Sequence, residues 1–321
     1  MQKDTDAHDT SSNPASKPPL PLTALEGVLQ ILPFQTHASL SKAAAQNDDD
    51  THDTLIRPLV PLEPMTPYPL GDLPDVYKSV LDPVEALTFV AGQTSRVLLG
   101  TAVLNLPWYS PVLLSRRLAT LDVLSNGRLR LGFGQGWSRD EYVAAGTPWE
   151  NRGKRFEEAL QALKTIWATD PVEFEGEFYS IPRSFIGPKP VQKPHPPIYV
   201  GAYAPAALTR TARFADGWLT VGMPLPMTGE IFSSIQQQAA EAGRDPGEVE
   251  LIVRGNVELS DQPLADDRAV FAGTAEQIAA DISAARALGA SELIMDATFD
   301  PGVHSVDDFL GRMELLFRLA N

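Results

Sequence analysis

Apolar and polar positions along the chain predict short strands that alternate with helices. Seven runs are apolar or β-branched and are bounded by glycine, proline or polar residues, which is typical of buried strands. They cover residues 27–34, 96–104, 128–134, 197–202, 217–223, 249–259 and 292–298. A weaker run at 54–60 brings the predicted strands to eight.

Helical periodicity fills the intervals between these runs. Between residues 151 and 167, Asn151 stands where an N-cap belongs, and four apolar side chains follow at helical spacing. They are Phe156, Leu160, Leu163 and Trp167. A second helix is expected from Thr274, a capping residue, to Gly289, a residue type at which helices commonly end.

Strands that alternate with helices over about 300 residues predict an α/β protein of the (β/α)8 TIM-barrel type. A doubly wound open sheet is the structural alternative. Residues 171–181 depart from the alternation and predict a hairpin that turns at Glu175 and Gly176, inserted after the fourth strand, where insertions tend to shape active sites. The first βα unit is atypical and shortened, because residues 36–53 leave room for only a short helix.

Composition adds limits to this picture. The chain has 321 residues, 43% of them hydrophobic, and we expect a disordered tail at 1–22, which is rich in Asp, Ser, Thr and Pro, and a single domain at 23–321. No apolar run approaches the roughly 18 residues of a membrane span, and the N-terminus has no apolar signal segment, so we expect a cytoplasmic protein without a membrane partner. The net charge of −15 argues against a nucleic-acid partner.

Cysteine and histidine, two residue types that often bind transition metals, are absent or scattered in this sequence. Cysteine is absent, which excludes disulfides, thiolate nucleophiles and cysteine-bound metals. The histidines have no HxxxH or HExxH spacing, so no metal site is predicted. They are His8, His37, His52, His195 and His304. We therefore expect a bound organic cofactor to supply any redox chemistry.

Residues 128–142, RLRLGFGQGWSRDEY, begin as a strand and then place glycines at 132, 134 and 136. The G-x-G-x-G spacing is not a dinucleotide fingerprint, because no acidic residue closes a second strand about 20 positions later. The end of this strand and the end of the preceding one, at 100–103, would open on the same face of a barrel. Glycines at that point would let a large flat ligand lie against the backbone.

The block LLGTAVLNLPWYSPVLLSRRLATLDVLSNGRLRLGFGQGWSRDEY resembles the bacterial luciferase-like superfamily of flavin- and deazaflavin-dependent oxidoreductases. Later segments resemble it too, in the same order: ENRGKRFEEALQALKTIW, VEFEGEFY, PKPVQKPHPPIYVGAYAPAALTRTARFADGWL and GTAEQIAADI. The resemblance covers roughly residues 80–298. Each motif is loose by itself, and their shared order and spacing make the resemblance specific.

Members of that family hold a flavin or deazaflavin ring at the carboxyl end of the barrel strands. By position, the bulge under the ring, often with a non-prolyl cis peptide, falls at Ala102 and Val103. Asn105 would hydrogen-bond the ring edge, and Trp137 would wall the substrate side. The other implied cofactor contacts are Thr101, Gly134, Gln135 and Gly136 around the ring, and Gly201, Ala202 and Tyr203 in the phosphate-tail loop ahead of a helix with Pro205 in its first turn.

Three residues near the implied ring are candidate catalytic proton donors: Asp53, Asp140 and Tyr142. Glu141 and Arg152 match positions where the family commonly carries Glu and Arg, and we expect an ion pair that pins the loop after the fourth strand. The chain departs from the family at Asp53, which Thr54 follows where many members have a histidine. It departs again at Trp137, where some sugar-phosphate dehydrogenases carry a glutamate acid, and this argues against that substrate.

The resemblance implies an enzyme that binds coenzyme F420 or FMN and performs hydride transfer or monooxygenation on a small organic substrate. The run from GTAVL to GQGW favours F420 over FMN. A separate reductase that supplies reduced cofactor and a homodimeric state are further expectations. The alternative is a non-catalytic barrel, a degenerate paralogue or partner subunit, which the shortened first unit favours. A glycosidase-like barrel is disfavoured, because Asp140 and Glu141 are adjacent and cannot flank a bond.

Overall fold

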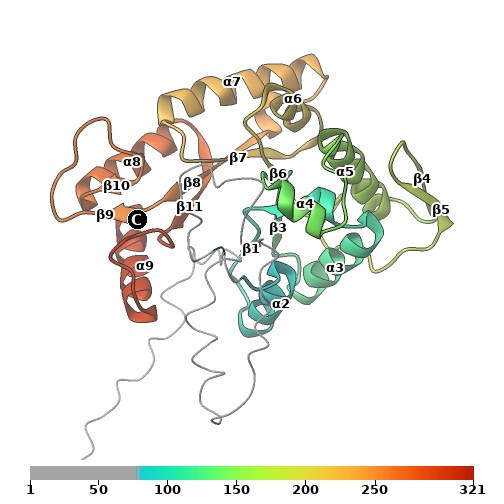
Figure 1. Cartoon of the computed structure of the whole chain (residues 1–321), viewed down its shortest axis with the longest axis horizontal. Coiled ribbons are helices and arrows are strands. Elements are labelled where there is room, and N and C mark those ends of the chain that lie inside the picture. Colours follow the sequence, from blue (N-terminus) through green and yellow to red (C-terminus); the bar gives the residue numbers. More distant parts are fainter. Residues whose placement is uncertain (1–76, 78–79) are drawn as a thin grey trace, which may run out of the picture.

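The computed structural model describes Tyr77 and residues 80–321, which form a curled sheet with helices along its outer side (Figure 1). All strand pairs of this sheet are parallel. The strand order is β1 (Leu99–Gly100), β3 (Leu129–Gly134), β6 (Ile198–Gly201), β7 (Gly217–Val221), β8 (Glu250–Asn256) and β11 (Ala290–Asp296), and β2 (Leu104–Asn105) also pairs with β3. The α/β prediction is confirmed as a parallel half-barrel.

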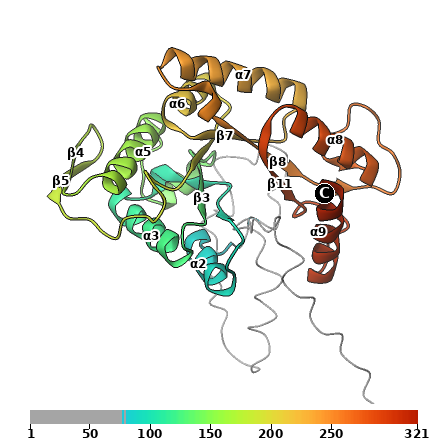
Figure 2. The ribbon, with the colours of Figure 1, turned by 180° about the vertical axis from the view of Figure 1, so that it is seen from behind.

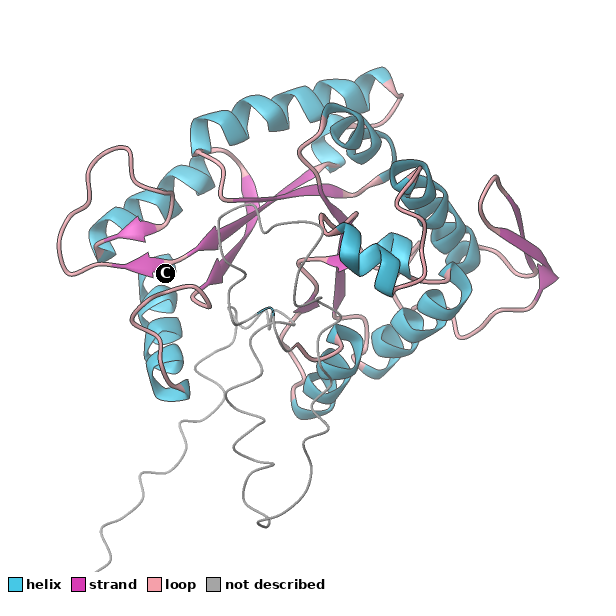
Figure 3. Ribbon diagram, in the orientation of Figure 1, coloured by secondary structure: helices cyan, strands magenta, loops and turns pink. Residues whose placement is uncertain are grey.

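Helices connect these strands and cover the convex side of the sheet (Figures 2 and 3). They are α2 (Pro83–Gln93), α3 (Pro111–Leu124), α4 (Arg139–Ala144), α5 (Arg152–Ala168), α6 (Pro205–Phe214), α7 (Leu225–Glu241), α8 (Ala275–Ala287) and α9 (Val306–Ala320). The 3-10 helices are η3 (Leu106–Trp108) and η4 (Pro246–Glu248). Two further strand pairs lie outside the main sheet: β4 (Val172–Glu175) with β5 (Ser180–Ser184), and β9 (Glu258–Leu259) with β10 (Ala272–Gly273).

Six of the eight predicted strands fall on described residues, and each overlaps a strand of the sheet. The run 96–104 divides into β1 and β2, and the non-prolyl cis peptide between Ala102 and Val103 lies in the gap. The run 249–259 likewise divides into β8 and β9. The predicted strands at 27–34 and 54–60, the shortened first unit and the tail at 1–22 lie outside the described residues.

The predicted helix ends agree with the structure except at one side chain. Thr274 caps α8 in a capping box with Gln277, and Gly289 follows the helix with φ 84°. Asn151 does occupy the N-cap position of α5, but it adopts a left-handed conformation, and its side chain makes no capping hydrogen bond. The predicted N-cap position is therefore confirmed, and the backbone conformation of Asn151, not its side chain, begins the helix.

The inward-facing side chains of the half-barrel form layers, as successive residues of a strand alternate between its two faces. At the amino end, Arg130 on β3 forms ion pairs with Glu250 (2.8 Å) on β8 and Glu292 (3.1 Å) on β11. The hydroxyl of Tyr199 donates to Glu250 at 2.8 Å. The next layer towards the carboxyl end is apolar and contains Ala102, Tyr199, Leu219, Ile252 and Ile294.

A larger apolar core lies between the sheet and its helices. The indole of Trp218 on β7 is fully buried there and donates to the Ala202 carbonyl at 2.8 Å, and that of Trp167 on α5 donates to Ser115 at 3.2 Å. Each such side chain contributes about 2–3 kcal/mol through burial, and its N–H keeps a partner. In the described part of the chain, no helix has the length and apolar character that crossing a membrane requires.

The β4–β5 pair projects from the molecule beyond α5 (Figures 1 and 2). Its strands are antiparallel, and the turn is held by Glu158 of α5, whose carboxylate accepts the N–H groups of Glu177, Phe178 and Tyr179 at 2.7–3.0 Å. The segment thus follows α5 and packs on its outer side instead of overhanging the strand ends.

Candidate functional site

The carboxyl ends of β2, β3 and β6 bring five of the expected cofactor residues together. A methyl group on Gly134 would lie 2.6 Å from Val103 and 3.7 Å from the Asn105 side-chain oxygen. One on Gly136 would lie 3.1 Å from the same amide, and one on Gly201 would lie 3.4 Å from Val103. The glycines therefore surround Val103 and Asn105 with bare backbone. We call these five residues the glycine cradle.

Gly136 and Gly134 are constrained in different ways. Gly136 has φ 73°, a left-handed conformation that side chains disfavour, and it lies against the Asn105 amide. Gly134 ends β3 and is paired in register with Asn105. A larger residue at Gly134 would displace Val103, whereas a larger residue at Gly136 would push on Asn105.

Thr101 lies beside the cradle, and its hydroxyl is already engaged. Its Oγ1 donates to the Gly132 carbonyl at 2.8 Å and accepts from the Gly132 N–H at 3.1 Å. Thr101 is almost fully buried. Its observed task is to hold the chain before the cis peptide against β3.

Tyr142 fixes the segment that follows the cradle. Its ring is fully buried in edge-on contact with Trp108 (6.1 Å between centroids) and Trp149 (5.1 Å), and its hydroxyl donates to the Gln135 carbonyl. Burial, the largest cause, raises the pKa of Tyr142 to about 12. These contacts suit an anchor for Gln135 better than a proton donor. Trp137 is 39% exposed at the rim.

The two neighbouring carboxyl groups of α4 differ in their surroundings. Asp140 is 3% exposed, whereas Glu141 is partly buried. Desolvation, with a smaller effect of Asp140, raises the pKa of Glu141 to about 7. The expected ion pair between Glu141 and Arg152 is wrong for this structure, because Arg152 instead stacks 3.8 Å from the centroid of the Trp149 ring. Asp53 lies outside the described residues.

The expected phosphate loop lies beside the cradle, at the start of α6. Gly201 ends β6, and Pro205 is the first residue of the helix. The N-cap residue, Ala204, offers no side-chain capping group. Pro205 has no N–H, and the N–H groups of Ala207 and Leu208 donate to the Ala204 carbonyl, so Ala206 is the residue of the first turn whose N–H can face a ligand. Tyr203 reaches across to β7, where its hydroxyl bonds the backbone of Val221 at 3.0–3.1 Å.

Three polar residues near the mouth of the half-barrel were not expected from the sequence: Arg254 and Asn256 on β8 and Asp296 on β11. Asp296 is 1% exposed, forms an ion pair with Arg254 and accepts two hydrogen bonds from Thr298. The Arg254 Nε and the Asn256 Oδ1 are buried without a hydrogen-bond partner. The sequence signal was the RGN triplet at the carboxyl end of an apolar strand.

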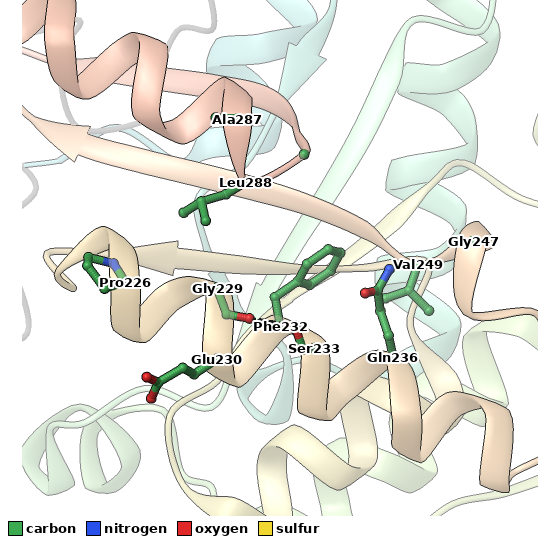
Figure 4. A pocket seen from close by; sticks show the side chains of 11 residues that line it. Pro226, Gly229, Glu230, Phe232, Ser233, Gln236, Gly247, Val249, Ala287 and Leu288 are labelled. Atoms are coloured by element: carbon green, nitrogen blue, oxygen red, sulfur yellow. Dashed lines mark hydrogen bonds between the residues drawn. The ribbon is translucent and has the colours of Figure 1, made fainter.

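A pocket of about 660 Å³ lies elsewhere, between α7 and the segments that precede β8 and β11 (Figure 4). Its lining includes Phe232, Val249 and Leu288. Because it opens at the amino ends of the strands, it is remote from the cradle. Among the described residues, no group of three or more His, Cys, Asp or Glu side chains could hold a metal ion.

Comparisons with known proteins agree with this fold. The model of the luciferase-like monooxygenase family matches residues 71–265. An uncharacterized protein of Mycobacterium tuberculosis is 38% identical over 191 residues, which is 58% of this chain and 67% of that protein. An FMNH2-dependent dimethylsulfone monooxygenase of Pseudomonas putida is 35% identical over 47% of this chain and 42% of its own.

An F420-dependent glucose-6-phosphate dehydrogenase of Microbacterium testaceum is 33% identical over 52% of this chain and 51% of its own. The matched region thus spans about half the length of each of these two enzymes. Among solved structures, monooxygenase RslO1 of Streptomyces bottropensis superposes with a TM-score of 0.65 at 26% identity, over 76% of this chain and 83% of its own. The coenzyme F420-dependent tetrahydromethanopterin reductase of Methanopyrus kandleri has a TM-score of 0.63 at 18% identity, over 74% and 86%.

Proposed function

The chain belongs to the luciferase-like monooxygenase family, and we propose that it binds a flavin or deazaflavin at the glycine cradle for an oxidoreductase reaction. The reaction is hydride transfer to or from a small organic substrate, or its monooxygenation. The observation that carries this proposal is the cradle itself. Side chains at Gly134, Gly136 or Gly201 would fill the space beside Val103 and Asn105.

The residues present fit such a cofactor in three respects. The cradle offers bare backbone and the side chain of Val103 to a flat ring, and Asn105 offers an amide to its edge. The start of α6 offers the Ala206 N–H and the positive end of a helix dipole to a phosphate. The unpartnered atoms of Arg254 and Asn256 offer a donor and an acceptor.

When bound, the ring supplies the redox chemistry, and the protein supplies binding, orientation and exclusion of water. Val103 and the glycines would hold the ring, and Trp137 would cover the substrate side. Tyr142 keeps Gln135 in place through its bond to the carbonyl. Asp140 and Asp53 are proposed proton donors, and we add Glu141, because a pKa near 7 suits proton exchange at neutral pH.

We propose coenzyme F420 ahead of FMN, because the segment from residue 100 to 141 resembles the deazaflavin branch more closely. A small organic substrate, a separate reductase that supplies the reduced cofactor, a cytoplasmic location and a homodimer complete the proposal. The named relatives use both cofactor types, since one is FMNH2-dependent and another F420-dependent.

Equilibrium binding tests this proposal directly. FMN and F420, oxidised and reduced, are titrated into the purified full chain and into a Gly136→Trp variant. We expect micromolar or tighter binding of one cofactor, with a loss of at least about tenfold (about 1.4 kcal/mol) in the variant. A Gly146→Trp variant is the matched control, because Gly146 also has positive φ (66°) but has no heavy atom within 4 Å of an added Cβ. If neither cofactor binds the unaltered chain in either redox state, the proposal fails.

A further inference from the structure

Arg254 and Asn256 face the interior of the half-barrel. A side chain on Gly255 would meet the Phe271 ring, which belongs to the outer core between sheet and helices. Because successive residues of a strand point to opposite faces, the residues on either side of Gly255 point inward. Ile252, two positions before Arg254, belongs to the inner apolar cluster and agrees with this direction.

These side chains lie at the height of the glycine cradle. Arg130 forms ion pairs with both Glu250 and Glu292 at the amino end of the half-barrel. Four residues further along the same strands are Gly134, Arg254 and Asp296, on the same inward face and about 13 Å higher. A flat ligand that rests on Gly134 therefore extends across the mouth towards Arg254.

The two side chains carry complementary, unused hydrogen-bonding atoms. The Arg254 Nε is a donor and the Asn256 Oδ1 is an acceptor, and both are buried without a partner. A buried polar atom that stays unpaired destabilises the folded protein, and a ligand that pairs with it relieves that penalty. Asp296 holds the guanidinium of Arg254 in position and is itself fixed by Thr298. A donor and an acceptor are thus preorganised side by side.

We propose that Arg254 and Asn256 form the recognition site for the imide edge of the bound ring, where a carbonyl oxygen stands beside an N–H group. Arg254 donates to the carbonyl oxygen, and Asn256 accepts from the ring N–H. The guanidinium also favours the negative charge that two-electron reduction of a flavin, with uptake of one proton, leaves on this side of the ring. This inference rests on the proposed function.

Ring analogues test the edge contact without relying on the phosphate site. Riboflavin and 5-deazariboflavin lack a phosphate, and their 3-methyl derivatives lack the imide N–H. For whichever of the two rings the unaltered chain binds, we expect 3-methylation to weaken binding by about tenfold. In an Asn256→Ala variant, we expect 3-methylation to weaken binding by no more than about twofold. An equal penalty in both proteins would overturn the inference while leaving the proposed function intact.

Arg254 is tested with a substitution that keeps its ion pair. Arg254→Lys retains a charge for Asp296 but loses the Nε donor, and we expect about tenfold weaker binding of the unmethylated ring. Arg312→Lys is the matched control, since Arg312 also forms an ion pair with a buried aspartate, Asp300, although it does so through its Nε at 2.8 Å. The control should bind the ring unchanged. Equal ring affinity in Arg254→Lys and the unaltered chain contradicts the inference.

The charge of Arg254 has a separate readout in the reduction potential of the bound ring. An Arg254→Met/Asp296→Asn double variant removes both charges together and avoids a buried unpaired carboxylate. We expect it to lose affinity for the reduced ring about tenfold more than for the oxidised ring, which lowers the potential by about 30 mV. An unchanged potential overturns the charge effect. Failure of the unaltered chain to bind any ring in either redox state overturns the proposed function as well.

Discussion

The carboxyl group of Glu141 carries a marked electrostatic cost for a single side chain. It lies on α4 between the buried Asp140 and the buried Tyr142, and no side chain in the described part of the chain forms an ion pair with it. Desolvation is the largest cause that raises the pKa of Glu141 to about 7, and Asp140 adds to it. The folded state therefore holds this proton more tightly than the unfolded state does.

We predict that Glu141→Gln stabilises the protein at pH 8 by about 2 kcal/mol, after allowance for partial exposure. Because the folded pKa is above the unfolded one, the stability contributed by the protonated group is complete below about pH 4.5 and is lost as the pH rises through about 7. Urea denaturation at pH 4.5, 6 and 8 checks this. The difference between the two proteins should shrink towards pH 4.5, and a gain of equal size at every pH would contradict it.

At this same scale, the site was predictable where a motif fixes the backbone. The residues Val103, Asn105, Gly134, Gly136 and Gly201 were all named from glycine spacing and resemblance, and they do meet. Arg254 was not predicted, because an apolar run such as ELIVRGNVEL indicates a strand but not which of its faces turns inward. That direction follows from the packing of Gly255 against Phe271 on one face and of Ile252 in the inner cluster on the other.

The sequence predicted which segments form helices and strands better than it predicted where each of them begins and ends. Capping residues identified α8 correctly, since Thr274 and Gly289 act through local backbone chemistry. The division of the run 96–104 into β1 and β2 could not be read from apolar pattern alone, and the resemblance located the cis peptide at Ala102 and Val103 that separates them. The position of the β4–β5 pair beyond α5 depends on Glu158, whose carboxylate accepts hydrogen bonds from three backbone N–H groups about 20 residues later in the sequence.

One side chain joins α2 to the sheet. Arg128, at the start of β3, is buried and donates to the carbonyls of Ala91, Thr94, Val97 and Ser125 and to the Thr94 hydroxyl. We predict that Arg128→Met destabilises the protein by about 3 kcal/mol, because it leaves the carbonyls at the end of α2 without donors. Urea denaturation measures this loss.

Arg116→Met is the matched control for that experiment. Arg116 makes one exposed hydrogen bond, to the Gly187 carbonyl at 3.3 Å, so its loss should change the free energy of unfolding by less than about 0.5 kcal/mol. A similar small change for both variants would show that Arg128 does not tie α2 to the sheet.

At the scale of the whole molecule, the side chains inside the half-barrel change in type from the amino ends of the strands to their carboxyl ends. Ion pairs close the amino end, apolar side chains fill the middle, and glycines with unpartnered polar atoms open the carboxyl end. The sequence predicted the alternation of strands and helices that builds this arrangement. It could not predict the layers, because they depend on how far neighbouring strands are staggered.

The last prediction concerns the ion pairs at the amino end of the half-barrel. Arg130 is the cation that faces both Glu250 and Glu292, and burial, the largest cause, raises the pKa of Glu292. We predict that Arg130→Met destabilises the protein by about 2 kcal/mol at pH 8, because two partly buried carboxylates lose their counter-ion in the half-barrel. Arg318→Met, which breaks the exposed pair with Glu314, should change stability by less than about 0.5 kcal/mol.

Acid should partly rescue the Arg130→Met variant. The folded pKa of Glu292 is already raised, and removal of the nearby cation, which lowers it, raises it further. A raised carboxyl pKa means that stability increases as the pH falls and the folded state takes up the proton. Thermal unfolding between pH 8 and pH 5 should therefore show the variant approaching the unaltered chain. A deficit that stays constant over this range would mean that Arg130 acts through packing alone, and the amino end of the half-barrel would then be held by shape instead of charge.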